Sequence, residues 1–265
     1  MPTAQPWADY VERFHLERPG ITETLLSRAA DGHGTGPYAW LGAAVPDGGP
    51  VLDLGCGSGP ARELVGRWVG LDRSMAELGR AQALGRSPSV LATASTMPLR
   101  SGSVAAVIAA MSLMVVDDPP AALDEVRRVL APGGRLAVLL PADGPLTVAD
   151  RARYAALLTG LGRRALPFPR PEVVADPVTV LEAAGLEVLA DDRRRFACAL
   201  DKGDADLFVD SLYLPDVFPR RLGLARALVR RWGSTGIGIP LRRLVARPRA
   251  AADRALSCGR GPRSR

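Results

Sequence analysis

The chain has 265 residues, 47% of them hydrophobic, so it can bury the core of a complete α/β domain. Its longest apolar run, residues 104–116, is interrupted by Ser112 and is too short to cross a bilayer. The N-terminus carries no secretory leader, and Cys56, Cys198 and Cys258 form no C-x-x-C pair. These features exclude a disulfide-stapled class and predict a cytoplasmic protein with reduced thiols, no metal site and no membrane association.

Residues 1–44 precede the first predicted strand and contain both histidines, His15 and His33. Residues 10–20 have the spacing of an amphipathic helix, and we expect the whole segment to form an N-terminal helical lid. His33 lies in a glycine-flanked loop, where we expect it to be exposed.

Residues 51–59 read V-L-D-L-G-C-G-S-G, a buried strand that ends in a turn with three glycines at alternate positions. Glycine permits positive φ and lets a ligand lie against bare backbone. A helix predicted over Pro60–Gly66 would direct its N–H groups at the same ligand. The alternative interpretation is a glycine-rich turn that binds nothing.

A second apolar run, residues 68–71, ends in Asp72. An acid about twenty residues past a glycine turn is suited to accept both hydroxyl hydrogens of a ribose. Alternatively, Asp72 only caps the helix predicted over Met75–Leu84, because Asp is a favoured N-cap residue.

The remaining pattern alternates strands with helices, which predicts a parallel sheet. Residues 104–111 are apolar on every side, as expected of a central strand. The other predicted elements are strands at 89–93, 135–141, 186–200 and 238–246, and a helix at 119–130.

The string D-x-G-x-G-x-G at residues 53–59 resembles motif I of the class I S-adenosylmethionine (SAM)-dependent methyltransferases, and Leu130–Leu136, L-x-P-G-G-x-L, resembles a second mark of that family. The resemblance is strong over residues 45–141. It implies a Rossmann-like three-layer α/β sandwich with a mostly parallel sheet, a last antiparallel strand and helical cap elements. It also implies a SAM-binding domain over residues 45–248.

In that family the strand-end acid, here Asp53, acts through the amino group of the methionine moiety, and the glycine turn passes under the cofactor. Thr93 stands where the family usually has an Asp that holds the adenine amine, so adenine recognition departs from the pattern. We expect cofactor contacts from Asp53, Gly55, Cys56, Gly57, Gly59, Asp72, Arg73, Ser74, Ala94, Ser95 and Met111.

The N-terminal helix in similar enzymes folds over the cofactor. Tyr10, Phe14 and Arg18 share one helix face, so Tyr10 could approach the sulfonium and Arg18 could pair with the carboxylate of SAM. His15 is the candidate catalytic base, with packing of the lid as the alternative.

Two insertions, near residues 142–175 and 203–233, are placed to close over the site, because ligands bind beyond the carboxyl ends of the strands. The second contains Phe208, Tyr213 and Phe218. Their spacing fits ordinary core packing, but a cap of this kind suits a small apolar or aromatic molecule.

Residues 220–265 contain thirteen arginines and one acid, a net charge of +12, which leaves −6 for residues 1–219. The segment 249–265 is a basic tail that we expect to be disordered. Such an end favours either nucleic-acid binding or a solvated tail. The second is preferred, because no aromatic residues interleave with the arginines to stack on bases and Lys202 is the only lysine.

The sequence therefore predicts a SAM-dependent methyltransferase that acts on a small organic acceptor rather than on nucleic acid and has no membrane partner. It leaves a homodimer open. One alternative is an RNA methyltransferase, although residues 117–121 lack the N/D-P-P-Y signature. The other is a SAM-binding protein of this fold with a different reaction or no transfer activity.

Overall fold

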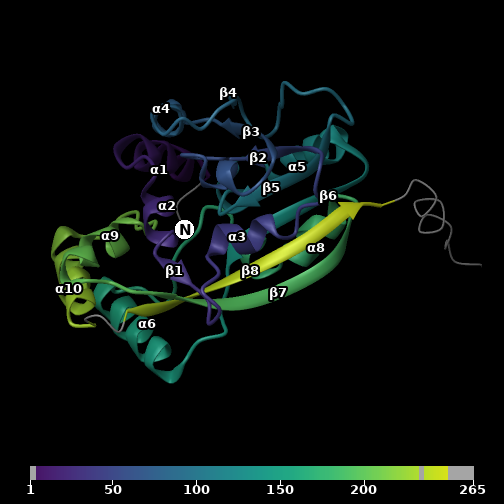
Figure 1. The fold of residues 1–265 in the computed structure, drawn as a ribbon. Coiled ribbons are helices and arrows are strands. Elements are labelled where there is room, and N and C mark those ends of the chain that lie inside the picture. Colours follow the sequence, from purple (N-terminus) through teal and green to yellow (C-terminus); the bar gives the residue numbers. More distant parts are fainter. Residues whose placement is uncertain (1–3, 233–235, 250–265) are drawn as a thin grey trace, which may run out of the picture.

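The computed structural model describes residues 4–232 and 236–249, in which one eight-stranded sheet carries every strand (Figure 1). The order of the strands across the sheet is β1-β7-β8-β6-β5-β2-β3-β4. The strands are β1 Ala29–Ala30, β2 Pro50–Leu54, β3 Arg67–Asp72, β4 Ser89–Leu91, β5 Val104–Ala110, β6 Leu130–Pro141, β7 Leu186–Cys198 and β8 Ile237–Pro248.

Ten α-helices occur in the part of the chain that the structure describes. They are α1 Ala4–Glu17, α2 Ile21–Leu26, α3 Pro37–Gly42, α4 Met75–Ala83, α5 Pro119–Val129, α6 Val148–Leu161, α7 Pro171–Ala175, α8 Pro177–Ala183, α9 Ala205–Asp210 and α10 Pro219–Arg230. Short 3₁₀ turns are η1 Pro60–Glu63, η2 Leu113–Val115 and η3 Lys202–Asp204.

Five strands, β4, β3, β2, β5 and β6, are parallel. The last strand, β8, lies antiparallel between β6 and β7, and the short β1 pairs antiparallel with the outer side of β7. The predicted Rossmann-like sandwich with a last antiparallel strand is confirmed.

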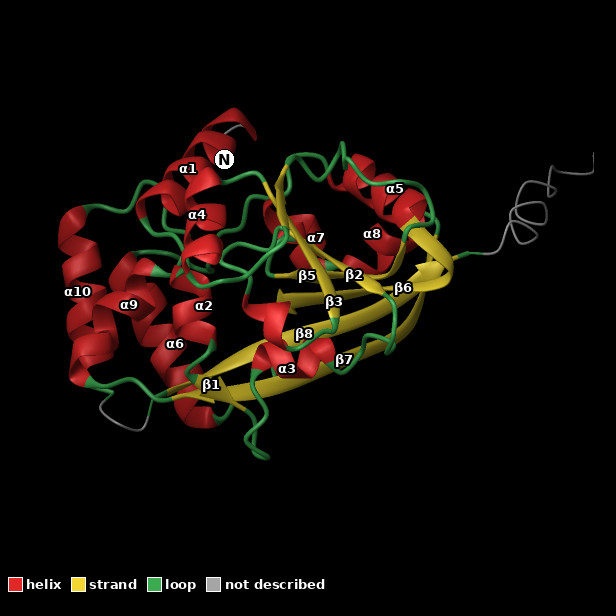
Figure 2. Cartoon of the chain, turned by 45° about the horizontal axis from the view of Figure 1, so that its top comes forward, coloured by secondary structure: helices red, strands yellow, loops and turns green. Residues whose placement is uncertain are grey.

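Alternate residues of the central strands enter two separate cores. On β5, Val107 packs on one face and Ile108 on the other, and both are fully buried. Helices α5, α7 and α8 cover the first face, while α2, α3, α6, α9 and α10 cover the second (Figure 2). This two-sided burial explains why the central strands read as unbroken apolar runs.

The cap segments gather with α1 and α2 at one end of the sheet (Figures 1 and 2). Helix α6 comes from the first insertion, and α9 and α10 come from the second. Asp150, which is fully buried on α6, accepts hydrogen bonds from the Arg195 side chain of β7 and from the backbone N–H of Gly238 on β8. The Arg195 guanidinium holds the pKa of this carboxyl well below its usual range and ties α6 to the last two strands.

Two predicted element boundaries are wrong. The helix expected over Pro60–Gly66 is only the single turn η1, and β3 already begins at Arg67. The fifth parallel strand begins at Leu130 rather than at residue 135, and its proline-glycine segment forms an irregularity within the pairing to β5.

The N-terminal segment is more than a helical lid. It supplies β1 at the sheet edge, and α3 packs Trp40, which is 2% exposed, into the core. The basic tail, apart from Arg249, and Cys258 lie outside the described residues. Among the described residues, no helix has the length and apolar character required to cross a membrane.

Candidate functional site

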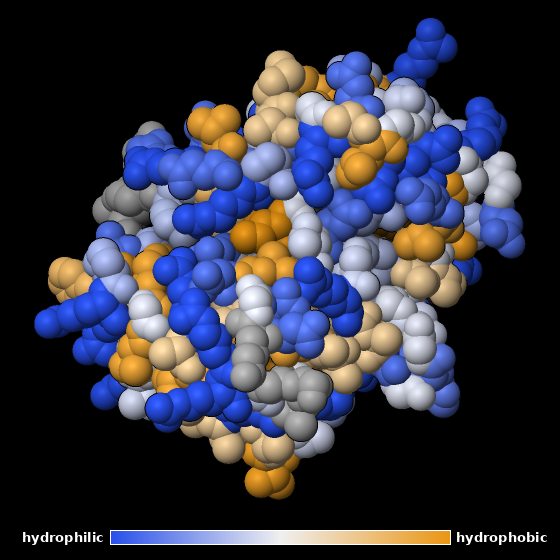
Figure 3. Space-filling model, turned by 60° about the vertical axis from the view of Figure 1, so that its left-hand side comes forward, coloured by the Kyte–Doolittle hydropathy of each residue, from blue (hydrophilic) through white to orange (hydrophobic). Residues whose placement is uncertain are grey.

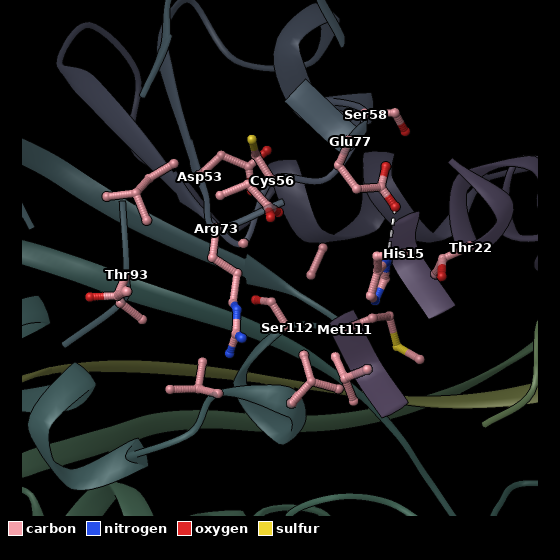
Figure 4. A pocket seen from close by; sticks show the side chains of 18 of the residues that line it. His15, Thr22, Asp53, Cys56, Ser58, Arg73, Glu77, Thr93, Met111 and Ser112 are labelled. Carbon is pink, nitrogen blue, oxygen red and sulfur yellow. Dashed lines mark hydrogen bonds and ion pairs between the residues drawn. The ribbon is translucent and has the colours of Figure 1, made fainter. Parts of the chain in front are cut away.

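A pocket, here named the glycine-turn pocket, lies at the carboxyl ends of β2, β3 and β5 (Figure 4). The backbone N–H groups of Gly55 and Cys56 both donate to the carbonyl of Leu71, and that of Gly57 donates to Asp72 Oδ2 at 2.8 Å. Because these donors are used within the protein and η1 has only four residues, the turn is not built as a phosphate cradle.

Two of the glycines have the positive φ that favours glycine, and one of them, Gly55, also lacks room for a side chain. Gly55 has φ +65° and a Cβ there would lie 2.5 Å from Ser112 Cβ, whose hydroxyl donates to the carbonyl of Leu54. Gly57 has φ +53° and a Cβ would lie 3.6 Å from Glu77 Oε2. Gly57 and Gly59 shape the turn but are not among the residues that line the pocket.

Asp53 lines the pocket with a carboxylate that is almost completely buried, at 1% exposure. Its Oδ2 accepts the indole N–H of Trp68 at 3.0 Å, whereas its Oδ1 is buried and has no partner among the described residues. Burial raises the pKa of Asp53 to about 7, although the Trp68 hydrogen bond opposes the shift. A ligand with a cationic donor at Oδ1 would satisfy this group.

Asp72 lies at the end of β3 and also lines the pocket. One oxygen of its carboxylate accepts the backbone N–H of Gly57, and the other accepts the backbone N–H of Ser74, each at 2.8 Å. The N-cap of α4 is Ser74, whose hydroxyl accepts from the backbone N–H of Glu77, so Asp72 is not the helix cap itself. Ser74 lies outside the pocket lining.

Arg73 reaches into the pocket between its two ends (Figure 4). Its guanidinium pairs with Asp117 at 2.5 Å and lies 3.8 Å from Glu12 on α1. The pair connects the end of β3 to the segment before α5.

The far end of the pocket carries Ala94 and the exposed Thr93 and Ser95, whose hydroxyls lie 3.4 Å apart. In Figure 4 Thr93 and His15 occupy opposite ends of the pocket, with Asp53 between them. Met111, with φ 57°, lies near His15.

His15 makes a hydrogen bond with each of its ring nitrogens. Nδ1 lies 2.8 Å from Oε1 of Glu77 on α4, and Nε2 lies 3.0 Å from the hydroxyl of Tyr213. Glu77 is 4% exposed, and its Oε2 accepts the backbone N–H of Gly20. The pairing therefore joins α1, α4 and the segment after α9.

The face of α1 that lines the pocket carries Val11 and His15. Tyr10 and Arg18, predicted as cofactor contacts, instead line a separate hollow on the next face of the helix. The hydroxyl of Tyr10 accepts the backbone N–H of Leu214, and Arg18 lies over the ring of Phe14. Tyr10, Phe14 and Arg18 share one helix face, as predicted. This face packs against the segment after α9 and does not line the glycine-turn pocket.

A second cavity of about 390 Å³, here named the apolar chamber, adjoins the first. Its walls are mostly aliphatic and aromatic and come from both cap insertions and from β8. Thr22, Met111 and Tyr213 line both cavities. The chamber is also lined by three aromatic residues, Tyr154, Phe168 and Phe208.

The structure brings together nine of the predicted residues around the glycine-turn pocket. They are His15, Asp53, Gly55, Cys56, Asp72, Arg73, Ala94, Ser95 and Met111. Sequence reasoning missed Glu77 and Asp117. It placed Tyr213 in a cap over the site but did not predict its hydrogen bond to His15, since only the folded chain brings these positions together. Cys56 and Cys198 are free and buried, and no metal-binding group of His, Cys, Asp or Glu occurs in residues 4–232 and 236–249.

Comparison with known proteins finds that residues 52–138 match a family model described as a methyltransferase domain. A malonyl-[acyl-carrier protein] O-methyltransferase from Alcanivorax borkumensis is 33% identical over 115 residues, which cover 38% of this chain and 39% of the relative. A ubiquinone/menaquinone biosynthesis C-methyltransferase from Hahella chejuensis is 35% identical over 111 residues, which cover 37% and 45%. The chain thus spans less than half of the length of these curated relatives.

Solved structures share the fold. A candidate type II methyltransferase from Anaeromyxobacter dehalogenans has a TM-score of 0.60 at 23% identity and covers 80% of this chain and 94% of its own. The [4+2]-cyclase SpnF has a TM-score of 0.52 at 20% identity and covers 80% of each chain. These similarities concern the fold alone.

Proposed function

We propose that the chain is a class I SAM-dependent methyltransferase that transfers a methyl group from SAM to a small, apolar or aromatic organic acceptor; the methyltransferase-domain match over residues 52–138 supports the proposal. The observation that carries this proposal is Asp53 in the glycine-turn pocket. Its buried Oδ1 has no partner among the described residues, and the amino group of SAM is a cationic donor that could satisfy it.

The other pocket residues fit the remaining parts of SAM. Asp72 is proposed to accept the ribose hydroxyls while it keeps Gly57 and Ser74 in place. Thr93 and Ser95 lie at the opposite end of the pocket from His15, where the adenine ring is expected. The glycine turn fits a ligand without phosphates, because the N–H groups of Gly55, Cys56, Gly57 and Gly59 are already used.

The apolar chamber is the proposed acceptor site. It adjoins the end of the pocket that holds His15 and Met111, so an acceptor there would approach the methyl-bearing end of SAM. Phe168, Phe208 and Tyr154 give the chamber aromatic walls, which suit an apolar or aromatic body better than a polynucleotide.

SAM supplies a methyl carbon bonded to positively charged sulfur, so the protein needs mainly to position the acceptor and exclude water. The lid residue His15 is hydrogen-bonded to the cap residue Tyr213, which lines both cavities. His15 is also the proposed base, because it is the histidine that lines the pocket.

Calorimetry with SAM, S-adenosylhomocysteine and NAD tests the proposal. We expect micromolar binding of both sulfur compounds and no binding of NAD, because the turn offers no phosphate site. Binding of NAD but of neither SAM species would overturn the proposal. Product analysis with SAM and a panel of phenols, amines and carboxylates would then separate methyl transfer from a different reaction on the same fold, of which the cyclase SpnF is an example.

A further inference from the structure

The boundary between the glycine-turn pocket and the apolar chamber is the place where a methyl group must pass under the proposed function. Three side chains line both cavities, namely Thr22, Met111 and Tyr213. Of these, only Tyr213 has its polar group hydrogen-bonded to His15. Its phenol oxygen is therefore the polar atom at the boundary that can connect an acceptor to His15.

The hydrogen bonds at His15 have a defined direction. Glu77 is a carboxylate that only accepts, so Nδ1 of His15 carries the hydrogen of the 2.8 Å bond. In the neutral ring Nε2 is then an acceptor, and the hydroxyl of Tyr213 donates to it at 3.0 Å. Burial raises the pKa of the Tyr213 phenol, so this hydroxyl keeps its proton near neutral pH and its oxygen lone pairs remain able to accept.

We propose that Tyr213, His15 and Glu77 form a proton relay at this boundary and that the acceptor is an apolar compound with a hydroxyl group. The inference rests on the proposed function and names its acceptor class. Tyr213 is the catalytic residue that contacts the acceptor hydroxyl. His15 receives the proton through Tyr213, and Glu77 is a positioning residue for His15.

The transfer step balances. The acceptor oxygen forms a bond to the methyl carbon as the carbon–sulfur bond breaks and its electron pair returns to sulfur. The acceptor proton moves to Tyr213 Oη, and the Tyr213 proton moves to Nε2 of His15. The positive charge therefore leaves sulfur and appears on the imidazole, where the carboxylate of Glu77 faces it at 2.8 Å from Nδ1. Bulk water later removes this proton.

A structural role for the same residues would look different. His15 and Tyr213 would then only fasten α1 to the cap, together with the ring contact between Phe14 and Tyr213 at 4.7 Å. Loss of the Tyr213 hydroxyl would lower stability but would not change acceptor discrimination. The hydroxyl of Tyr10, which accepts the backbone N–H of Leu214 and so also fastens α1 to the cap but lines neither cavity, provides a matched control.

The first experiment uses the full chain saturated with S-adenosylhomocysteine and 1-naphthol as the probe. We expect Tyr213→Phe to bind 1-naphthol about fivefold more weakly than the wild type, because one hydrogen bond is lost. With SAM present, methylation of 1-naphthol should fall at least a hundredfold in Tyr213→Phe, whereas Tyr10→Phe should methylate it at close to the wild-type rate. Equal turnover in Tyr213→Phe and the wild type would overturn the relay.

The second experiment needs no turnover. The chain has two histidines, so ¹⁵N-histidine labelling in a His33→Gln background isolates the ring of His15. We expect the Nδ1–H form at pH 8 and its loss in Glu77→Gln, with affinity for 1-naphthol retained. The Nε2–H form in the otherwise unchanged protein would contradict the proposed direction of proton transfer.

The outcomes separate the two levels of inference. A complex that binds S-adenosylhomocysteine but not 1-naphthol would overturn the relay and its acceptor class and leave the proposed cofactor function standing. Failure to bind S-adenosylhomocysteine at all would overturn the proposed function itself.

Discussion

At the scale of single residues, Asp53 is unfavourably placed unless a ligand binds. Its carboxyl is 1% exposed and one oxygen lacks a partner among the described residues. Because burial raises its pKa to about 7, the unliganded protein holds a proton there below that pH. The pKa of Asp53 is therefore higher in the folded protein than the usual value near 4 that it has in the unfolded chain. Protonated Asp53 adds most to the free energy of unfolding below pH 4, and this stabilisation is lost as the pH rises to about 7.

Ligand binding should reverse this preference. A cationic amino group at Oδ1 favours the ionised carboxylate, so affinity for S-adenosylhomocysteine should rise with pH up to about 7 and then level off. Below pH 7 binding should release a proton, which calorimetry in buffers of different ionisation enthalpy measures. The Asp53→Asn variant should bind S-adenosylhomocysteine at least tenfold more weakly than the wild type at pH 8, and its affinity should not rise with pH. The exposed Asp124→Asn is the control, and a pH-independent wild type would contradict the assignment.

Asp72 combines a structural and a proposed binding role. It accepts the backbone N–H groups of Gly57 and Ser74, each at 2.8 Å. Asp72→Ala removes both bonds and the proposed ribose contact, so we expect affinity for S-adenosylhomocysteine to fall at least tenfold. Asp72→Asn keeps one acceptor oxygen, so its affinity for S-adenosylhomocysteine should fall less than that of Asp72→Ala. Unchanged affinity in Asp72→Ala, measured by calorimetry, would leave Asp72 with only its role in the turn.

At the scale of elements, a polar cluster joins α2 to the glycine turn and to the loop after α4. Arg86 donates to both carboxylate oxygens of Glu23, at 2.8 and 2.9 Å, and to the carbonyl of Ser58. The Ser58 hydroxyl donates to the same carboxylate. The side chains of Arg86 and Glu23 are only 13% and 16% exposed.

Removal of Arg86 should therefore lower stability and loosen the pocket together. We expect Arg86→Ala to reduce the free energy of unfolding in urea by about 2 kcal/mol, because the nearly buried carboxylate loses its partner. Affinity for S-adenosylhomocysteine should also fall, since Glu23 lines the pocket. Arg127→Ala, which breaks the exposed pair with Asp124, should cost less than about 0.5 kcal/mol. Equal losses in the two variants would contradict this ranking.

The elements that the sequence predicted well are those with a local signal. The apolar strand ending in Asp53 and the strand ending in Asp72 lie where the pattern placed them, because strand burial and acid spacing are readable locally. The helix after Gly59 was wrong because glycine and proline spacing does not show how soon the next strand begins. The pocket-facing side of α1 was one residue away from the predicted face, because helix periodicity does not say which face meets which partner.

The His15, Glu77 and Tyr213 group could not be predicted from the sequence. His15 is 62 positions from Glu77 and 198 positions from Tyr213 in the sequence. Nothing in the local sequence marks Glu77 or the Tyr213 hydroxyl as the partner of a histidine. Only the packing of α1 on α4 and of the second cap insertion on α1 brings them together.

At the scale of the whole molecule, most of the described arginines of the basic C-terminal part pair with carboxylates of the acidic remainder. Residues 220–249 contain nine arginines. Six of them pair with carboxylates, namely Arg226, Arg230, Arg242, Arg243, Arg247 and Arg249. On the face that carries α9 and α10, hydrophilic side chains predominate and apolar ones form small groups (Figure 3). This pairing does not favour a continuous basic surface for nucleic acid.

Deletion of residues 250–265 tests what the end of the chain contributes. The deletion removes four arginines and one aspartate and lowers the net charge from +6 to +3. The ladder between β7 and β8 ends with Leu186 opposite Pro248, and the backbone N–H of Arg249 donates to Gly185. We therefore expect the deletion to leave the thermal midpoint and the affinity for S-adenosylhomocysteine unchanged. Filter binding of a single-stranded RNA between 50 and 300 mM NaCl should detect no tight complex with either form. RNA binding by the full chain that weakens steeply with salt and disappears on deletion would instead favour a nucleic-acid acceptor, because release of counterions from phosphates gives that slope.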